Sequence, residues 1–198
     1  MMSELSIYIH WPYCLSKCPY CDFNSHVSDK KIDQEEFLEL IEKEIDYHGK
    51  YIDNKKISSI FFGGGTPSLM DPNIIERILA RLSSRCSIEN DTEITMEANP
   101  TSVELQKFRD YSNIGVNRIS IGVQSLDNDD LKNLGRTHTA ELAIEAIGIA
   151  QKHFESVSID LIYARPGQNE KAWKLELERA LSLQTQHLSL YQLTIEPN

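Results

Sequence analysis

The sequence lacks long apolar runs and is poor in basic residues. Its 20 Lys and Arg stand against 30 Asp and Glu, for a net charge of -10. Because nucleic acids are polyanions, this balance argues against a nucleic-acid partner. No apolar run approaches the ~20 residues of a transmembrane helix. The N-terminus also lacks the basic segment and apolar core of a secretory signal. We therefore expect a cytoplasmic protein without a transmembrane segment.

Cysteine is scarce too, and its placement is uneven. Of four cysteines, three lie at Cys14, Cys18 and Cys21, and the fourth, Cys86, is far away in the chain. A disulfide framework would need an oxidising compartment, usually with an even number of cysteines in a short secreted chain. We expect Cys86 to be an inert residue at a helix end.

Low-complexity tracts are absent, and the pattern instead alternates strand with helix. The predicted strands are 5–10, 57–62, 93–98, 118–123, 156–163 and 187–193, and the predicted helices are 33–48, 73–82, 103–111, 127–134, 139–153 and 170–183. Asp33, Asp71 and Thr101 or Ser102 are plausible helix caps. Six strands that alternate with helices predict an α/β fold: a partial (β/α)6 barrel with parallel strands. With 198 residues, 40% of them hydrophobic, we expect residues 1–198 to form a single domain.

Polar residues gather where the predicted strands end. The cysteines follow the first strand, Gly63 to Thr66 end the second, Glu97 ends the third and Gln124 ends the fourth. Asp160 lies in the fifth strand, and 191–194 end the sixth. The carboxyl ends of parallel strands carry the functional residues in barrel enzymes, so we expect one site there.

The cysteine spacing is C-x3-C-x2-C. Three thiolates are one short of the four that usually hold a [4Fe–4S] cluster, so one iron would stay open to a ligand that is not protein. A zinc site is the main alternative, with His10 or His26 as the fourth ligand.

Individual polar residues allow two interpretations each. Glu97 could accept hydrogen bonds from a cofactor amino group, or cap a helix. Gln124 has a donor and an acceptor for a ribose or carboxylate, or for loop contacts. Arg136 could pair with a carboxylate, or be a solvated arginine beside a helix start. Asp160, among apolar residues, needs a partner such as a ribose diol, or else the neighbouring Arg165.

The cysteine motif together with Gly63-Gly64-Gly65-Thr66-Pro67 resembles the radical S-adenosylmethionine (SAM) superfamily. In that superfamily SAM binds the open iron, and the glycine-rich strand end holds its methionine amino group. Further stretches look like the oxygen-independent coproporphyrinogen III oxidase family. These stretches are 8–14, 63–68, 122–125, 160–163 and 188–197. Where the oxidases carry a fourth cysteine, this chain has Phe23, which resembles the heme chaperone (HemW) branch.

That resemblance implies a [4Fe–4S] cluster, SAM and heme as bound groups, and an acceptor protein that receives the heme. It implies Cys14, Cys18 and Cys21 as cluster ligands. It implies SAM contacts at Tyr8, Tyr20, Gly64, Gly65, Thr66, Glu97, Gln124, Arg136, Asp160 and Thr194. The other function considered is an oxidase-like enzyme that uses SAM to abstract hydrogen from a porphyrinogen side chain. A metal-binding scaffold or a non-functional fragment is the third.

The family's C-terminal domain has no counterpart in this sequence. Members continue beyond the sixth strand to a heme-contacting His-Asn-x-x-Tyr-Trp stretch, which is absent here. We expect a fragment, one half of a split protein whose second chain supplies the missing region, or a degenerate product. The sixth strand would then have an exposed edge and face.

Overall fold

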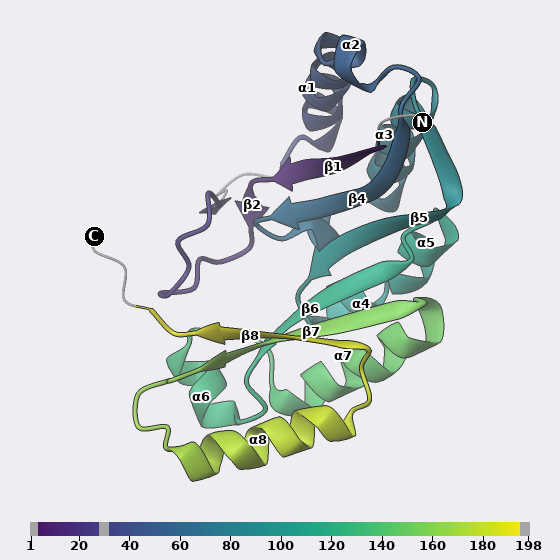
Figure 1. Ribbon diagram of the computed structural model, residues 1–198. Helices are drawn as coiled ribbons and strands as arrows, with labels where there is room; N and C mark the ends of the chain where they lie inside the picture. The colour runs from purple at the N-terminus through teal and green to yellow at the C-terminus, as the bar shows by residue number, and fades with distance from the viewer. Residues whose placement is uncertain (1–3, 28–31, 195–198) are drawn as a thin grey trace.

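Six parallel strands form one curved sheet in the computed structural model, which describes residues 4–27 and 32–194. Their order is β1-β4-β5-β6-β7-β8 (Figure 1). The strands are β1 Glu4–Trp11, β4 Lys56–Gly64, β5 Ser87–Ala98, β6 Arg118–Gln124, β7 Ser156–Tyr163 and β8 His187–Gln192. Neighbours in the sheet are consecutive in this series, so the predicted parallel α/β architecture is confirmed.

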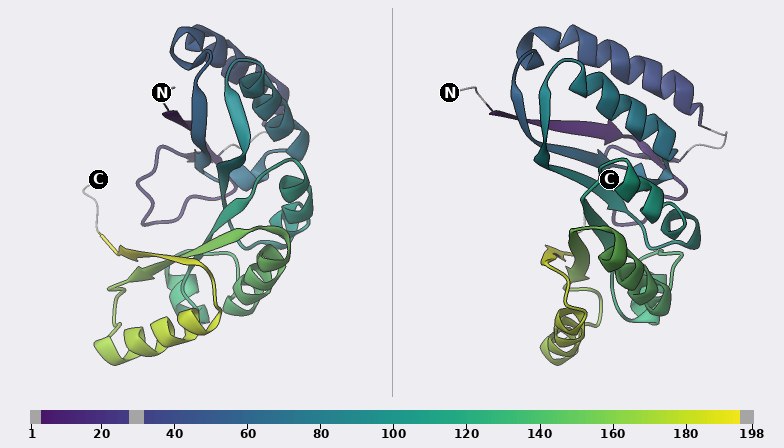
Figure 2. Two further views of the ribbon diagram at one scale, coloured as in Figure 1. Left: turned by 45° about the vertical axis from the view of Figure 1, so that its right-hand side comes forward. Right: turned by 90° about the vertical axis from the view of Figure 1, so that its right-hand side faces the viewer.

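The helices lie along the convex side of the sheet, and the cysteine loop lies on the concave side (Figure 2). They are α1 Gln34–Tyr47, α2 Gly49–Ile52, the 3-10 turn η1 Pro67–Leu69, α3 Pro72–Ser83, α4 Ser102–Leu105, α5 Phe108–Asn113, α6 Asn128–Asn133, α7 Ala140–His153 and α8 Glu170–Ser182. Among the described helices, none is long and apolar enough to cross a membrane.

The core lies between the sheet and these helices. Ile57, Ile60 and Phe62 of β4 are fully buried in this core, as are Ile75 and Ile78 of α3. Burying each such side chain stabilises the fold by about 1.5–3 kcal/mol. The glycine-rich carboxyl end of β4 therefore follows a well-packed strand.

The expected helix starts at Asp33 and Asp71 are confirmed. The Asp33 carboxylate accepts hydrogen bonds from the backbone of Glu35 and Glu36, and Asp71 accepts one from Asn73. These carboxylates satisfy backbone N–H groups that have no partner within the helix.

The predicted helix 103–111 is wrong as a single element, because the chain breaks between α4 and α5. At the break, the Lys107 ammonium donates to the carbonyls of Leu69 and Met70, which pins the chain to the β4–α3 connection. Cys86 lies in the turn after α3 rather than in a helix, and its thiol donates to the Leu82 carbonyl at 3.1 Å.

The sheet edge at β8 pairs only with β7 within the described residues. Leu190 and Tyr191 on β8 are 43% and 55% exposed, as expected for an open edge and face. The last part of the stretch 188–197 that carries the family resemblance, from residue 195 on, lies outside the described residues.

Candidate functional site

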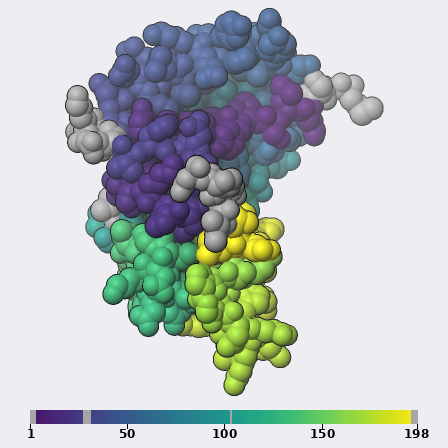
Figure 3. Space-filling view, turned by 90° about the vertical axis from the view of Figure 1, so that its left-hand side faces the viewer, coloured from purple at the N-terminus to yellow at the C-terminus, as the bar shows by residue number. Residues whose placement is uncertain are grey.

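A cavity of about 270 Å³ opens at the carboxyl ends of the strands. The space-filling view of this face shows the cysteine loop lying against the segment that carries α6 and beside β8 (Figure 3). Eleven of the thirteen predicted site residues line the cavity: Cys14, Cys18, Tyr20, Cys21, Gly65, Thr66, Glu97, Gln124, Arg136, Asp160 and Thr194. The sheet thus brings together residues spread over 181 positions of the chain.

The cysteine loop follows β1, and its two ends pair with each other. Cys14 is in the short strand β2 (Tyr13–Cys14), which pairs in parallel with β3 (His26–Val27). The Cys21 amide donates to the Cys18 carbonyl at 3.0 Å, which makes a tight turn between the last two cysteines. All three thiols are free and half-buried, and none is in a disulfide.

The thiols do not converge on a single point. Within the described residues, no three His, Cys, Asp or Glu side chains are placed to hold one metal ion. His10, one of the two candidate ligands of the zinc alternative, has both ring nitrogens engaged, since Nε2 donates to the Asn24 carbonyl and Nδ1 lies 3.1 Å from the Tyr8 hydroxyl. This arrangement does not assemble a tetrahedral zinc site, whereas an iron–sulfur cluster takes one cysteine at each of several irons.

The end of β4 lies too close to the cysteine loop for any side chain larger than glycine. A Cβ on Gly65 would be 2.6 Å from the Tyr13 carbonyl oxygen, and one on Gly64 (φ +117°) would be 2.6 Å from His10. The Thr66 amide donates to the Tyr13 carbonyl at 2.9 Å, and its hydroxyl donates to Cys14 Sγ at 3.4 Å. The two glycines therefore permit direct contact between the strand end and the first cysteine.

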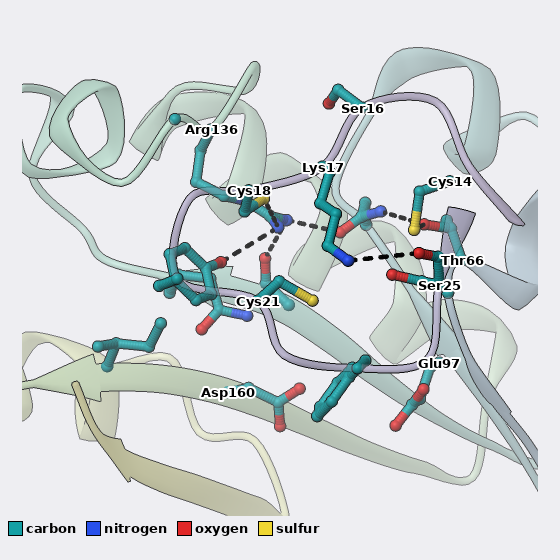
Figure 4. Close-up of a pocket in the computed structure, with 18 of the residues that line it drawn as sticks. Cys14, Ser16, Lys17, Cys18, Cys21, Ser25, Thr66, Glu97, Arg136 and Asp160 are labelled. Atoms are coloured by element: carbon teal, nitrogen blue, oxygen red, sulfur yellow. Dashed lines mark hydrogen bonds between the residues drawn. The ribbon is translucent and has the colours of Figure 1, made fainter. Parts of the chain in front are cut away.

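Two carboxyl groups lie below the cysteines, Glu97 from β5 and Asp160 from β7 (Figure 4). Glu97 Oε2 accepts the Gly64 amide at 3.0 Å, so it does not cap a helix. Burial, with a smaller contribution from Asp160, raises the pKa of Glu97 to about 7. Burial also raises the pKa of Asp160, which accepts a hydrogen bond from Ser120 at 3.1 Å.

Arg165 is not the partner of Asp160, so that sequence alternative is wrong. The Arg165 guanidinium instead pairs with Asp130 at 2.8 Å and Glu176 at 2.5 Å. It also donates to the carbonyls of Ile162 and Gln124, and so closes the turn after β7. Asp160 is therefore left facing the cavity.

Arg136 is the cation of the cavity rather than a solvated arginine. Its Nη1 lies 3.5 Å from both Cys18 Sγ and the Tyr20 hydroxyl, and its Nη2 donates to Asn99 and to the Gly122 carbonyl. Arg136 Nε is buried without a hydrogen-bond partner among the described residues. A buried, unpaired N–H of a cation suits an anionic ligand group.

Two predicted site residues are not among those lining the cavity. Tyr8 is 57% exposed on β1, and its hydroxyl lies 3.1 Å from His10 Nδ1. Gly64 takes part through its backbone amide, which donates to Glu97.

Gln124, which lines the cavity, ends β6 with φ +68°, a left-handed conformation that is uncommon for residues other than glycine.

Sequence reasoning missed several lining residues. They are Asn99, Ser120 and His138, besides others of the loops. The signal for Asn99 was its place two residues beyond Glu97 at a strand end. His138 Nε2 donates to the Val123 carbonyl at 3.0 Å, and burial lowers its pKa to about 4, so it is neutral and holds the end of β6.

Comparison with known proteins places this geometry in a family. The profile of the Radical SAM superfamily matches residues 8–180. The chain is 43% identical over its full length to the heme chaperone HemW of Escherichia coli, of which it covers 52%. It is 41% identical to the mitochondrial radical S-adenosyl methionine domain-containing protein 1 of Danio rerio, over 98% of this chain and 44% of that protein.

A solved structure with a similar fold is coproporphyrinogen III oxidase (HemN) from Escherichia coli, described as a radical SAM enzyme. It superposes with a TM-score of 0.89 at 27% identity, over 99% of this chain and 45% of that one. The chain thus spans about half the length of the relatives that it matches. With a superfamily profile that covers most of its residues, the chain belongs to the radical SAM superfamily.

Proposed function

We propose that this chain is the radical SAM part of a HemW-like heme chaperone, which binds a [4Fe–4S] cluster and SAM and takes part in passing heme to an acceptor protein. The observation that carries the proposal is the meeting of three free thiols with Thr66 and Arg136 at one cavity. The identity of 43% with a heme chaperone supports the same conclusion.

The residues present fit these groups. Cys14, Cys18 and Cys21 would hold three irons, and SAM would take the open one. When bound, the cluster supplies a reducible centre with one exchangeable coordination site. The other predicted residues would hold SAM, with the unpaired Arg136 Nε facing an anionic group and Glu97 facing a cationic one.

Phe23 favours the chaperone over the oxidase. It stands where the oxidases have a fourth cysteine, lines the cavity and is 57% exposed. The chain covers about half of its chaperone relatives. We therefore propose that heme transfer needs polypeptide equivalent to the rest of those relatives, in the same or a second chain. We also propose that the transfer takes place in the cytoplasm.

The second candidate is an oxidase-like radical SAM enzyme of porphyrin biosynthesis. The similarity to coproporphyrinogen III oxidase, with a TM-score of 0.89, favours it. Decarboxylated porphyrinogen formed with SAM and a reductant would support this candidate and contradict the chaperone proposal.

Reconstitution with iron and sulfide under anaerobic conditions tests the proposal. We expect about four irons per chain in the parent and in Cys86→Ala, whose thiol is buried away from the cavity. Cys18→Ala should lose most of the iron. Combined with polypeptide equivalent to the rest of those relatives, the loaded protein should then bind heme and release it to an apo-acceptor protein in a spectrophotometric transfer assay. Equal iron in Cys18→Ala, or stoichiometric zinc without a cluster, would contradict the proposal.

A further inference from the structure

A continuous chain of side-chain hydrogen bonds joins the first cysteine to the second (Figure 4). Thr66 Oγ1 donates to Cys14 Sγ at 3.4 Å, and Asn99 Nδ2 donates to Thr66 Oγ1 at 3.1 Å. On the other side, Arg136 Nη2 donates to Asn99 Oδ1 at 2.5 Å, and Arg136 Nη1 lies 3.5 Å from Cys18 Sγ. This series of hydrogen bonds therefore runs along the cavity from the Cys14 thiol to the Cys18 thiol.

Asn99 lies in the middle of this hydrogen-bond network. Its side-chain amide makes one hydrogen bond to Thr66 and one to Arg136. A guanidinium can only donate, so Arg136 requires the amide oxygen and the Nδ2 group faces Thr66. Thr66 Oγ1 accepts that bond, which leaves its own hydrogen to point at Cys14 Sγ. Asn99 thereby sets the direction in which Thr66 donates.

A buried carboxylate fixes Asn99 in turn. Glu104 is 1% exposed, and its Oε2 accepts the backbone N–H of Asn99 at 2.7 Å together with the Ser68 hydroxyl. Its Oε1 accepts the Thr101 hydroxyl at 3.1 Å. Because Ser68 belongs to η1, just after the glycine-rich strand end, Glu104 ties the end of β5 to the end of β4.

We propose that Asn99 is a positioning residue, supported by Glu104, that fixes the Cys14 and Cys18 thiols relative to each other before any cluster is bound. Neither residue is among the SAM or cluster contacts inferred from the sequence. Two measurements test this inference. Hydrogen–deuterium exchange does not depend on the proposed function, because the hydrogen bonds are present in the cluster-free chain, whereas electron paramagnetic resonance of the cluster rests on the proposed function.

Two substitutions at Asn99 separate its bond to Thr66 from its bond to Arg136. Asn99→Asp keeps an oxygen for Arg136 but turns the donor toward Thr66 into an acceptor, which draws the Thr66 hydrogen away from Cys14. Asn99→Ala removes both bonds. Asn73→Asp is the matched control, because Asn73 is exposed in the first turn of α3, where a negative charge is tolerated.

Hydrogen–deuterium exchange of the full, cluster-free chain is the first readout. In Asn99→Ala we expect amides of residues 13–21 to exchange at least threefold faster, with β6 unchanged. In Asn99→Asp the increase should be confined to residues 13–16. Asn73→Asp should match the parent. Unchanged exchange at 13–21 in Asn99→Ala, or an equal increase throughout β6, would overturn the proposal.

Electron paramagnetic resonance of the reconstituted, reduced protein is the second readout. Both Asn99 variants should show shifted g values relative to the parent and to Asn73→Asp. Identical spectra in all four proteins would overturn the positioning role. A parent without a cluster would contradict the proposed function, while the exchange measurement would still decide the role of Asn99.

Discussion

The guanidinium of Arg136 lies 3.5 Å from the thiol of Cys18, although 118 residues separate them in the sequence. Gly135 makes the approach possible. It adopts φ +71°, and a Cβ there would be 2.7 Å from Pro19 of the cysteine loop. The loop between α6 and α7 therefore brings a fixed positive charge to the cysteines.

Arg136→Lys tests the geometry of that cation rather than its charge. Lysine keeps the charge but lacks the planar fork that reaches Asn99, Gly122 and Cys18 together. We expect SAM affinity at least tenfold weaker by calorimetry on the reconstituted protein. The exposed Arg109→Lys serves as control and should bind SAM like the parent. Equal affinity in Arg136→Lys would exclude a bidentate role.

Gly65→Ala tests the close contact between β4 and the cysteine loop. The added Cβ would meet the backbone of Tyr13 at 2.6 Å, which cannot move aside as a flexible side chain can. Overpacking of this kind costs about 1–3 kcal/mol of unfolding free energy. Urea denaturation should show this loss.

Gly148→Ala is the matched control for that substitution. Gly148 lies in α7 with nothing within 4 Å of the added Cβ, so this variant should gain about 0.5–1 kcal/mol. Equal stability of the two alanine variants would contradict the predicted contact.

The carboxyl pair predicts a pH dependence of stability. The pKa of Glu97 is raised from 4.5 to about 7, so the folded chain keeps a proton that the unfolded chain releases between these values. The unfolding free energy of the cluster-free protein should therefore fall as pH rises from 5 to 7, by up to about 1.4 kcal/mol per pH unit.

Glu97→Gln should make that slope shallower. It should not abolish the slope, because burial also raises the pKa of Asp160. The exposed Glu39→Gln on α1 should leave the slope unchanged. Chemical denaturation at several pH values measures all three proteins, and an unchanged slope in Glu97→Gln would contradict the assignment.

Arg165→Met tests the buried ion pair that closes the turn after β7. The Arg165 and Glu176 side chains are only 4% and 8% exposed, so removing the cation leaves a buried carboxylate without its counter-charge. A loss of about 3–5 kcal/mol is expected. Arg77→Met, from an exposed pair with Glu35, should cost no more than about 1 kcal/mol. Similar losses for both variants in urea titrations would contradict this account.

The fold could be predicted because short strands rich in apolar residues alternate with helices that begin at clear caps. The β4 run ending in Gly63, Gly64 and Gly65 is one example, and the Asp71 cap of α3 is another. Most predicted site residues lie at the cavity because parallel strands place their carboxyl ends on one side.

Other features depend on contacts between distant loops, which no local pattern records. The break between α4 and α5 follows from Lys107 reaching the carbonyls of Leu69 and Met70. Arg165 is five residues from Asp160 in sequence, yet it pairs with Glu176, so proximity in the chain was misleading. The role of Asn99 likewise becomes visible only when Thr66 and Arg136 lie on either side of it.

Electron paramagnetic resonance of the reconstituted, dithionite-reduced protein, with and without SAM, tests the central claim most directly. The account predicts a [4Fe–4S]⁺ signal in the parent that shifts when SAM is added, because three cysteines leave one iron open. A signal that SAM does not alter, or no cluster signal at all, would contradict it.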